Sequence, residues 1–255
     1  MKGRHLEGKV ALLTGACRNL GAVTAERLAL AGANIIVNDV DRDDLKPITE
    51  RLLERLSSHE VAAAFLDADL SDTANVRSLC KKALDIWGRV DIVVNNAGPF
   101  QMDPFLKLKA EDWDRIMDVN VKAVYLTAQE LAPQMKMNGW GRIINMCAGS
   151  AFVRNHGVYG LAKAAVMTIT ESLALELGPE VAVNAVAPGQ IRESLPEIEK
   201  LDPTFGRRYS AHAPLQRLIT REEIARIISL MCSPAFDAVT GVTIRLDGGA
   251  EIPRF

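Results

Sequence analysis

Short apolar runs alternate with longer amphipathic stretches along most of the chain. The apolar runs predict buried strands at residues 10–13, 34–38, 61–66, 91–94, 142–146, 181–186 and 242–246. The stretches between them predict helices at residues 20–32, 43–56, 73–87, 110–137, 157–177 and 221–232. Buried strands that alternate with helices are typical of a parallel sheet covered on both faces. The pattern therefore predicts an α/β fold with a doubly wound parallel sheet.

One segment, residues 188–214, carries neither pattern. It is long for a connection inside a compact domain, so we expect the 188–215 region to form a loop or lid over a substrate. No linker rich in proline, glycine and serine interrupts the chain, which predicts a single domain over residues 1–255. With 48% hydrophobic and 24% charged residues, the composition is ordinary for a globular protein.

Charge and cysteine usage narrow the possible partners. The formal net charge of −2 gives no sign of a surface for nucleic acid. Four scattered cysteines without C-x-x-C spacing indicate reduced thiols rather than a metal site or a disulfide framework. The first residues contain no apolar stretch before Lys9, and no apolar run approaches the roughly 20 residues that span a bilayer. We therefore expect a cytoplasmic protein without membrane contact.

The turn between the first predicted strand and the first predicted helix reads TGACRNLG at residues 14–21. Gly15 allows a tight turn, and Gly21 lets the helix approach the sheet closely. The start of the helix then offers unpaired N–H groups to a pyrophosphate. Asn19 stands between the glycines, where its tolerance of left-handed backbone preserves the turn. The alternative is an ordinary strand-to-helix turn, but the acidic residue at position 39 favours a Rossmann-type dinucleotide site.

Asp39 follows the second predicted strand. A carboxylate there can accept hydrogen bonds from both hydroxyls of an adenosine ribose and repels a 2′-phosphate, which favours NAD over NADP. Arg18 favours NADP instead, because its guanidinium can pair with such a phosphate. Asp39 can also be read as a solvated turn residue, since Asp43 and Asp44 lie close by in the sequence.

The sequence resembles the short-chain dehydrogenase/reductase family from about Leu6 to Gly249. The similar segments are the glycine turn at 14–21, Asp69-Leu70, Asn95-Asn96-Ala97-Gly98, Tyr159-x-x-x-Lys163, Asn184-Ala185-Val186-Ala187-Pro188-Gly189 and Asp247-Gly248-Gly249. None of these motifs is specific alone, but their order and spacing together are. Among the members of the family, the chain looks most like the 3-oxoacyl-carrier-protein reductases.

The resemblance implies reversible reduction of a ketone, or oxidation of a secondary alcohol, by an NAD(P)-dependent enzyme. Members are typically homotetramers or homodimers that pair through the helices predicted at 110–137 and 157–177. The cofactor contacts that the resemblance and the glycine turn imply are Gly15, Arg18, Asn19, Leu20, Gly21, Asp39, Asp69, Leu70, Asn96, Ala97, Gly98, Tyr159, Lys163, Pro188, Gly189 and Ile191.

Tyr159 and Lys163 are four residues apart and therefore share one face of the predicted helix. A neighbouring ammonium stabilises a phenolate, so we expect Lys163 to lower the pKa of Tyr159. The phenol can then donate a proton to a carbonyl or take one from an alcohol. Asn120 lies on an apolar stripe between Ile116 and Val124, and the resemblance implies that it helps a proton relay through water toward the lysine. The alternative for Asn120 is a hydrogen-bonded core residue without a relay.

The sequence departs from the family at the serine that usually polarises the substrate carbonyl, because that position holds Ala148. Ser150 is the nearest hydroxyl and is a candidate substitute. Glu193 stands where the family has a threonine that contacts the nicotinamide carboxamide, with Ser194 beside it. These departures leave a second hypothesis open, a dinucleotide-binding protein that acts as a sensor or assembly partner without turnover. Because Tyr159 is retained, we favour the enzyme.

Overall fold

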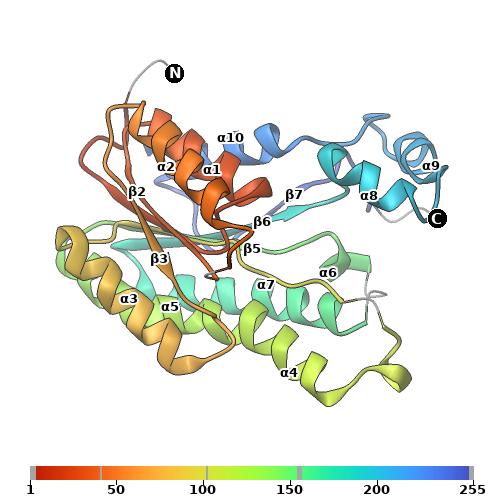
Figure 1. The fold of residues 1–255 in the computed structure, drawn as a ribbon, viewed down its shortest axis with the longest axis horizontal. Coiled ribbons are helices and arrows are strands. Elements are labelled where there is room, and N and C mark those ends of the chain that lie inside the picture. The colour runs from red at the N-terminus through yellow and green to blue at the C-terminus, as the bar shows by residue number, and fades with distance from the viewer. Residues whose placement is uncertain (1–3, 41, 102, 154–156, 253–255) are drawn as a thin grey trace.

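The computed structural model describes residues 4–40, 42–101, 103–153 and 157–252. A seven-stranded parallel sheet, in the order β3-β2-β1-β4-β5-β6-β7, forms its centre (Figure 1). The strands are β1 (Val10–Leu13), β2 (Asn34–Asp39), β3 (Ala63–Asp67), β4 (Ile92–Asn95), β5 (Gly141–Met146), β6 (Val181–Pro188) and β7 (Thr243–Leu246). The strands β1, β4 and β5 are fully buried, as expected for apolar runs between two helical layers.

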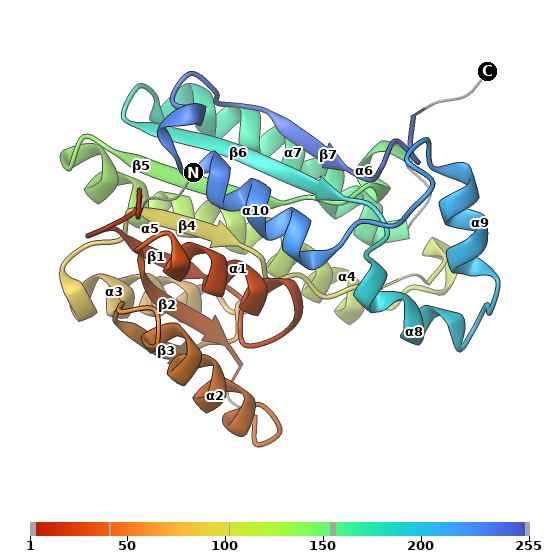
Figure 2. The same cartoon turned by 90° about the horizontal axis from the view of Figure 1, so that it is seen from above.

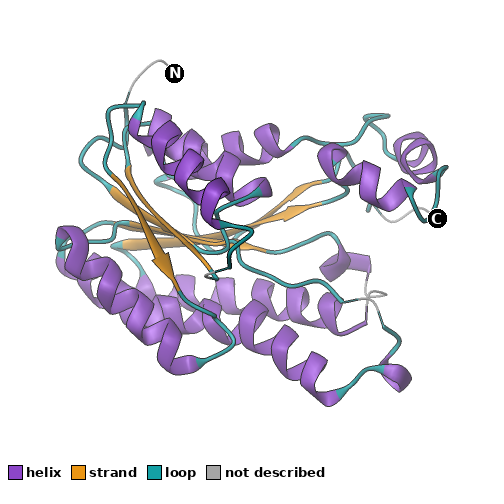
Figure 3. Ribbon diagram, viewed as in Figure 1, coloured by secondary structure: helices purple, strands orange, loops and turns teal. Residues whose placement is uncertain are grey.

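Helices cover both faces of the sheet (Figures 1 and 3). One layer contains α1 (Asn19–Leu30), α2 (Lys46–Ser57) and α10 (Arg221–Met231), and the other contains α3 (Thr73–Trp87), α4 (Ala110–Met117), α5 (Ala123–Met137) and α7 (Gly157–Leu177). The predicted doubly wound α/β class is therefore confirmed. The strand order reverses between β1 and β4, and the crevice beyond the carboxyl ends of these strands is where open α/β sheets bind ligands.

The long helix expected at 110–137 is interrupted in its middle. Residues Asp118–Lys122 form a π-helical turn between α4 and α5, in which the side chain of Asn120 is buried. The Asn120 Nδ2 atom donates hydrogen bonds to the backbone oxygens of Ile116, at 3.0 Å, and Pro99, at 3.1 Å. Hydrophobic periodicity cannot reveal such a turn, because one extra residue leaves the apolar stripe almost continuous on both sides.

The segment expected to be irregular at 188–214 contains two short helices, α8 (Leu195–Glu199) and α9 (Phe205–His212). These helices lie beyond the carboxyl ends of the strands, on one side of the molecule in both views (Figure 2). A third short helix, α6 (Ser150–Val153), follows β5 and was not predicted. Helices of four to eight residues are too short to show a clear 3.6-residue pattern, which explains these differences.

The helix α7 is long and apolar enough, by length and composition, to cross a membrane. The apolar runs along the sequence do not indicate this helix as a candidate membrane span. In the structure it packs against β5 and β6, with Val158, Ala162 and Val166 buried. Its other side leaves Leu161 and Leu175 exposed. The apolar composition of α7 thus supplies core contacts on one side and an uncovered surface on the other.

A buried polar network ties the sheet to the helices that carry the predicted catalytic residues. Asn95 of β4 donates a hydrogen bond to the Oδ1 atom of Asn145 in β5, at 2.9 Å. Thr127 of α5 donates to Asn95, and Asn145 donates to the Oγ1 atom of Thr170 in α7 at 3.0 Å. Each link satisfies a polar group that has no access to water, so the network fixes how α5 and α7 sit on the sheet.

Replacing Thr170 by valine is expected to lower the free energy of unfolding by about 1–3 kcal/mol, because the buried amide of Asn145 then lacks an acceptor. Thr24 of α1 is the matched control, since it is also buried but its hydroxyl has no hydrogen-bond partner among the described residues. Thr24→Val is therefore expected to be neutral or stabilising. Urea unfolding of both variants measures the difference, and equal losses would contradict the role assigned to the network.

Candidate functional site

The glycine turn lies at the carboxyl end of β1 and opens into α1. Gly15 has φ +58° and Asn19 has φ +54°, so both lie in the left-handed region. Asn19 adopts the left-handed backbone conformation that the sequence led us to expect it to tolerate. A Cβ atom on Gly15 would lie 2.8 Å from the Cα atom of Ala97, and one on Gly21 would lie 2.6 Å from the Cα atom of Ala16. Only glycine fits these two backbone contacts, which leave the start of α1 open to a ligand.

The loop after β4 holds this turn in place. The Oγ1 atom of Thr14 accepts hydrogen bonds from the backbone N–H groups of Asn96 and Ala97, both at 3.1 Å. The side-chain amide of Asn96 donates to the backbone oxygens of Thr14 and Gly15, at 3.0 and 2.8 Å. The side chain of Asn96 is thus committed to fixing the turn, although the residue also borders the cavity beside it.

A cavity of about 350 Å³ lies between the glycine turn and the ends of β2, β3 and β4. The predicted residues that line it are Gly15, Arg18, Asn19, Leu20, Gly21, Asp39, Asp69, Leu70, Asn96, Ala97 and Gly98. Sequence reasoning missed Asn38, Val40, Arg42, Ala68, Pro99, Arg115 and Val119, which also line it. Most of these adjoin a predicted residue, but Arg115 comes from α4 and had no signal. With bare glycine backbone and a helix N-terminus on its wall, the cavity fits a dinucleotide.

The carboxylate of Asp39 is held at the end of β2 rather than left in solvent. Its Oδ2 atom accepts a hydrogen bond from the backbone N–H of Cys17 at 3.3 Å, and its Oδ1 atom accepts one from Val40 at 3.0 Å. Three arginines share the cavity with it, Arg18, Arg42 and Arg115. The guanidinium of Arg42 is already occupied by hydrogen bonds to the carboxylate of Asp44, both at 2.9 Å.

The structure brings Lys163 Nζ and Asn120 Oδ1 close to the same side of Gly98, where a side chain would project. The Lys163 ammonium is buried and donates a hydrogen bond to the backbone oxygen of Met146 at 2.7 Å. A Cβ atom on Gly98 would lie 2.6 Å from Asn120 Oδ1 and 3.2 Å from Lys163 Nζ. Asn120 Oδ1 is buried and accepts no hydrogen bond from the described residues. A free acceptor therefore faces an ammonium with donors to spare, which is an arrangement suited to relaying a proton.

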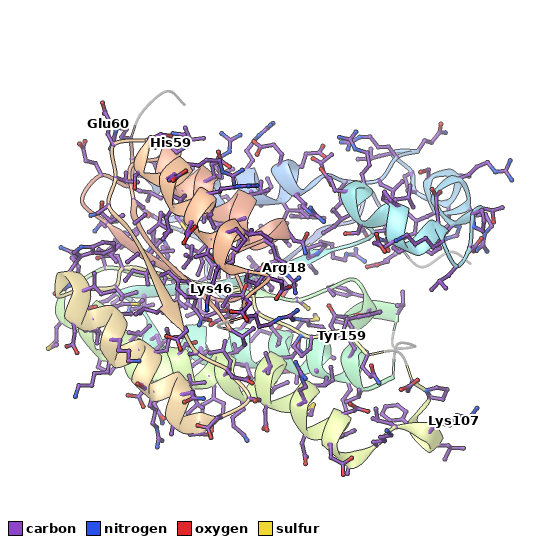
Figure 4. All side chains as sticks on the ribbon, viewed as in Figure 1. Arg18, Lys46, His59, Glu60, Lys107 and Tyr159 are labelled. Atoms are coloured by element: carbon purple, nitrogen blue, oxygen red, sulfur yellow. The ribbon has the colours of Figure 1, made fainter. Side chains whose placement is uncertain are left out.

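Tyr159 lies one turn before Lys163 on α7 and is labelled in Figure 4. The ammonium is 5.6 Å from the centroid of the phenol ring, and the ring of Phe100 packs edge-on against it at 4.8 Å. Burial raises the pKa of Tyr159, with a smaller contribution from Cys147. The expectation that Lys163 lowers this pKa is wrong for the protein without ligand, because Lys163 Nζ is directed to Met146 and desolvation dominates.

Position 148 holds an alanine, so this residue offers no hydroxyl to the carbonyl group of a substrate. Ser150, the proposed substitute, is the first residue of α6, and its Oγ atom is buried without a hydrogen-bond partner among the described residues. The backbone N–H of Gly149 donates to the oxygen of Pro188 at 2.9 Å, so the loops after β5 and β6 are joined. Ser150 keeps its hydroxyl available, but no contact among the described residues directs it toward Tyr159.

The remaining five predicted cofactor residues do not line the cavity. They are Tyr159 and Lys163 of α7, and Pro188, Gly189 and Ile191 on the other side of the strand-order reversal. Gly189 donates its N–H to the oxygen of Leu246, and Ile191 pairs with Ile219 in an isolated parallel bridge. Tyr209 of α9, which sequence reasoning missed, places its hydroxyl against this loop and accepts a hydrogen bond from Gln190 N at 3.0 Å.

Glu193 does not face the cofactor cavity. Its Oε2 atom accepts a hydrogen bond at 3.2 Å from the backbone N–H of Arg221, the first residue of α10. A carboxylate is favoured there, because the N-terminus of a helix carries partial positive charge. The carboxylate that replaces the family threonine is therefore turned away from any phosphate.

Comparison with known proteins gives consistent matches over the whole chain. The family described as Enoyl-(Acyl carrier protein) reductase matches residues 15–251. The chain is 32% identical over 247 residues to 3-oxoacyl-(acyl-carrier-protein) reductase FabG of Aquifex aeolicus, covering 96% of this chain and 98% of that protein. A short-chain type dehydrogenase/reductase from Mycobacterium marinum superposes with a TM-score of 0.85 at 30% identity, covering 98% of each chain.

A third match is the gluconate 5-dehydrogenase of Burkholderia cenocepacia, solved in complex with NADP and tartrate. It superposes with a TM-score of 0.89 at 29% identity and covers 98% of each chain. Together with the fold and the site geometry, these findings show that the chain belongs to the short-chain dehydrogenase/reductase family. It is an NAD(P)-dependent oxidoreductase of the kind that interconverts ketones and secondary alcohols.

The burial of Lys163 predicts a pH dependence of stability. Desolvation lowers the pKa of this ammonium to about 8, whereas in an unfolded chain it is about 10.4. Below pH 8 the lysine is charged in both states, and the buried charge costs stability. Above pH 8 the folded state releases the proton that the unfolded state still binds, so stability rises with pH until the unfolded pKa is reached.

The variant Lys163→Met removes this titration. We expect the difference in free energy of unfolding between the variant and the natural protein to fall by about 2 kcal/mol from pH 7 to pH 9.5. Denaturant unfolding at the two pH values measures it. The control is the exposed Lys107, labelled in Figure 4, whose replacement by methionine should show no such change. A difference for Lys163→Met that stays constant with pH would contradict the lowered pKa.

Proposed function

We propose that Tyr159 is the proton donor and acceptor of the reaction, that Lys163 holds the proton behind it, and that Asn120 extends the relay. The observation that supports this most is the convergence of Lys163 Nζ and Asn120 Oδ1 on Gly98, which also borders the cavity beside the glycine turn. Residues from α7, the π-helical turn and the loop after β4 meet there. No simple packing argument requires a buried ammonium beside a free amide oxygen.

In the reductive direction, a bound nicotinamide cofactor supplies the hydride. Tyr159 transfers its hydroxyl proton to the oxygen of the substrate as the carbonyl carbon is reduced. A bare phenolate in this buried position is unfavourable, as the raised pKa of Tyr159 shows. Lys163, with a pKa of about 8, is able to stabilise the phenolate while it is charged and to return a proton to it. Phe100 covers the ring of Tyr159 and limits the access of water.

The direct test replaces the hydroxyl of Tyr159 by hydrogen. Tyr159→Phe is expected to lower kcat by about 10²–10⁴-fold, since that is the usual contribution of a positioned general acid. NADH affinity should persist, because the glycine turn is untouched. Turnover is measured with the most reactive member of a panel of aliphatic, aromatic and 3-oxoester ketones, hereafter the reference ketone. The matched control is Tyr125→Phe, at an exposed tyrosine of α5. Full activity in Tyr159→Phe would eliminate the proposed role.

We further propose that the chain binds NAD(H) more tightly than NADP(H). The support is the carboxylate of Asp39, which two backbone N–H groups fix at the adenosine end of the cavity. A 2′-phosphate would meet this charge directly. Arg18 and Arg42 favour the phosphate, as does the NADP bound to the related gluconate 5-dehydrogenase. Because Arg42 is engaged by Asp44, we give the carboxylate the greater weight.

Dissociation constants for NADH and NADPH, measured by cofactor fluorescence, test this preference. Asp39→Ser is expected to weaken NADH binding by about tenfold through the lost ribose hydrogen bonds and to strengthen NADPH binding. Asp43→Asn, at an exposed acid that pairs with Lys46, is the control and should leave both constants unchanged. Tighter binding of NADPH than of NADH by the natural protein would refute the preference.

We also propose that two or four copies of the chain associate in the cytoplasm. The support is the exposure of two large apolar side chains of α7, Leu161 and Leu175. Exposed apolar side chains favour association of copies, and this is how members of the family typically pair.

A further inference from the structure

The carboxyl group of Glu251 lies against the backbone next to the position that lacks a serine. A Cβ atom on Gly149 would come within 1.7 Å of Glu251 Oε1 and 2.2 Å of Oε2, so the carboxyl group occupies the space that any other residue at 149 would fill. Gly149 follows Ala148 directly. Glu251 arrives from the turn after β7, which ends beside α6 (Figure 2). The loop after β5 and the turn after β7, which lie a hundred residues apart in the sequence, therefore pack against each other at the edge of the site.

This carboxyl group has no partner that would explain its burial. Its Oε2 atom is buried and without a hydrogen bond among the described residues. Arg245 acts on it electrostatically but is used elsewhere, because its guanidinium lies over the ring of Phe152 at 5.1 Å and donates to the backbone oxygen of Glu251 at 3.4 Å. A structural carboxylate normally has its oxygens satisfied by N–H groups or a cation, and this one does not.

The charged and titratable groups around Glu251 favour its neutral form. Burial of the carboxyl group is the largest cause, repulsion by Asp247 in the turn after β7 adds to it, and Arg245 opposes both. Cys147 and Tyr209 face it from the loop after β5 and from α9. The net result raises the pKa of Glu251 to about 7, so that a large fraction is protonated at neutral pH. A neutral carboxyl group can donate a hydrogen bond, which a carboxylate cannot.

The neighbours of Glu251 connect it to the proposed proton-transfer group. Cys147 interacts electrostatically with Glu251, Lys163 and Tyr159, and its thiol donates to the backbone oxygen of Lys163 at 3.1 Å. Gly149 in turn is bonded to Pro188 of the loop after β6. The carboxyl group thus lies where the ends of β5, β6 and β7 meet, on the side of the sheet where the substrate must enter.

We propose that Glu251 contacts the substrate and donates to its reacting oxygen the hydrogen bond for which position 148 has no hydroxyl. This inference rests on the proposed function of Tyr159. Glu251 keeps its proton throughout: in reduction the carbonyl carbon receives the hydride, the proton that ends on oxygen comes from Tyr159, and the carboxyl group only polarises the C=O bond. In the oxidative direction the same oxygen leaves the hydrogen bond when the ketone departs.

Three variants of the full chain test the assignment with NADH and the reference ketone. Glu251→Ala is expected to lower kcat by about 10²–10³-fold with little change in KM, as for the loss of one oxyanion donor. Glu251→Gln keeps an N–H donor at every pH, so it should retain most of the activity. The natural protein should lose reductive activity from pH 7 upward as Glu251 ionises, whereas in Glu251→Gln the loss should begin only near pH 8, where Lys163 releases its proton. Adding Ala148→Ser to Glu251→Ala should restore part of kcat.

A spectroscopic measurement examines Glu251 independently of turnover. The infrared difference spectrum of the free protein between pH 6 and pH 8 should show the carbonyl band of a neutral carboxyl group, and Glu251→Gln should remove it. Glu60→Gln is the matched control, since Glu60 is exposed and lies at the far end of the molecule in Figure 4. Cofactor binding and thermal unfolding confirm that each variant is folded.

The outcomes separate this inference from the proposed function. If Tyr159→Phe is inactive while Glu251→Ala is fully active, only the role of Glu251 fails. A defect confined to KM would overturn the contact with the reacting oxygen, and a large loss in Ser150→Ala with none in Glu251→Ala would assign the donor to Ser150 instead. The absence of the carboxyl band at pH 6 would also overturn the proposal. If Tyr159→Phe retains full turnover, the proposed function itself fails.

Discussion

The buried ammonium of Lys163 is the constraint on which the arrangement of the site depends. A charge in this position is costly, and among the described residues a single hydrogen bond offsets the cost, to the backbone oxygen of Met146. That bond requires β5 to end at Met146 and α7 to pass directly over it. The hydrogen bonds among Asn95, Asn145 and Thr170 hold β5 and α7 in these relative positions from inside the core. The buried Lys163 ammonium therefore lowers the free energy of unfolding, and the packing of the surrounding core compensates for this loss.

The sequence predicts the parts of the molecule that depend on repeated patterns. The strands and the helices longer than ten residues follow from apolar periodicity, and α3 was predicted to the residue. The glycine turn could also be predicted, because Gly15 and Gly21 are required by contacts of their own backbone. The positive φ of Asn19 follows from the same requirement.

The features that the sequence does not reveal depend on contacts between distant segments. The π-helical turn around Asn120 shifts the helix by a single residue, which periodicity does not detect. Arg115 reaches the cavity only because α4 lies beside the loop after β4. The raised pKa of Tyr159 depends on desolvation, a property of the assembled core rather than of the spacing to Lys163. Glu251 meets Gly149 only in the folded chain.

The contact of Tyr209 with the loop after β6 has a consequence for motion. The hydroxyl of Tyr209 rests on Gly189, where a Cβ atom would lie 2.4 Å from it, and it is bonded to Gln190. In the same loop, Ile191 is paired with Ile219. The helix α9 and the strand end beneath it are therefore mechanically coupled, because displacing one breaks a hydrogen bond of the other. Any movement of α9 away from the strand end therefore also frees the backbone at Gly189, so that the two segments move together.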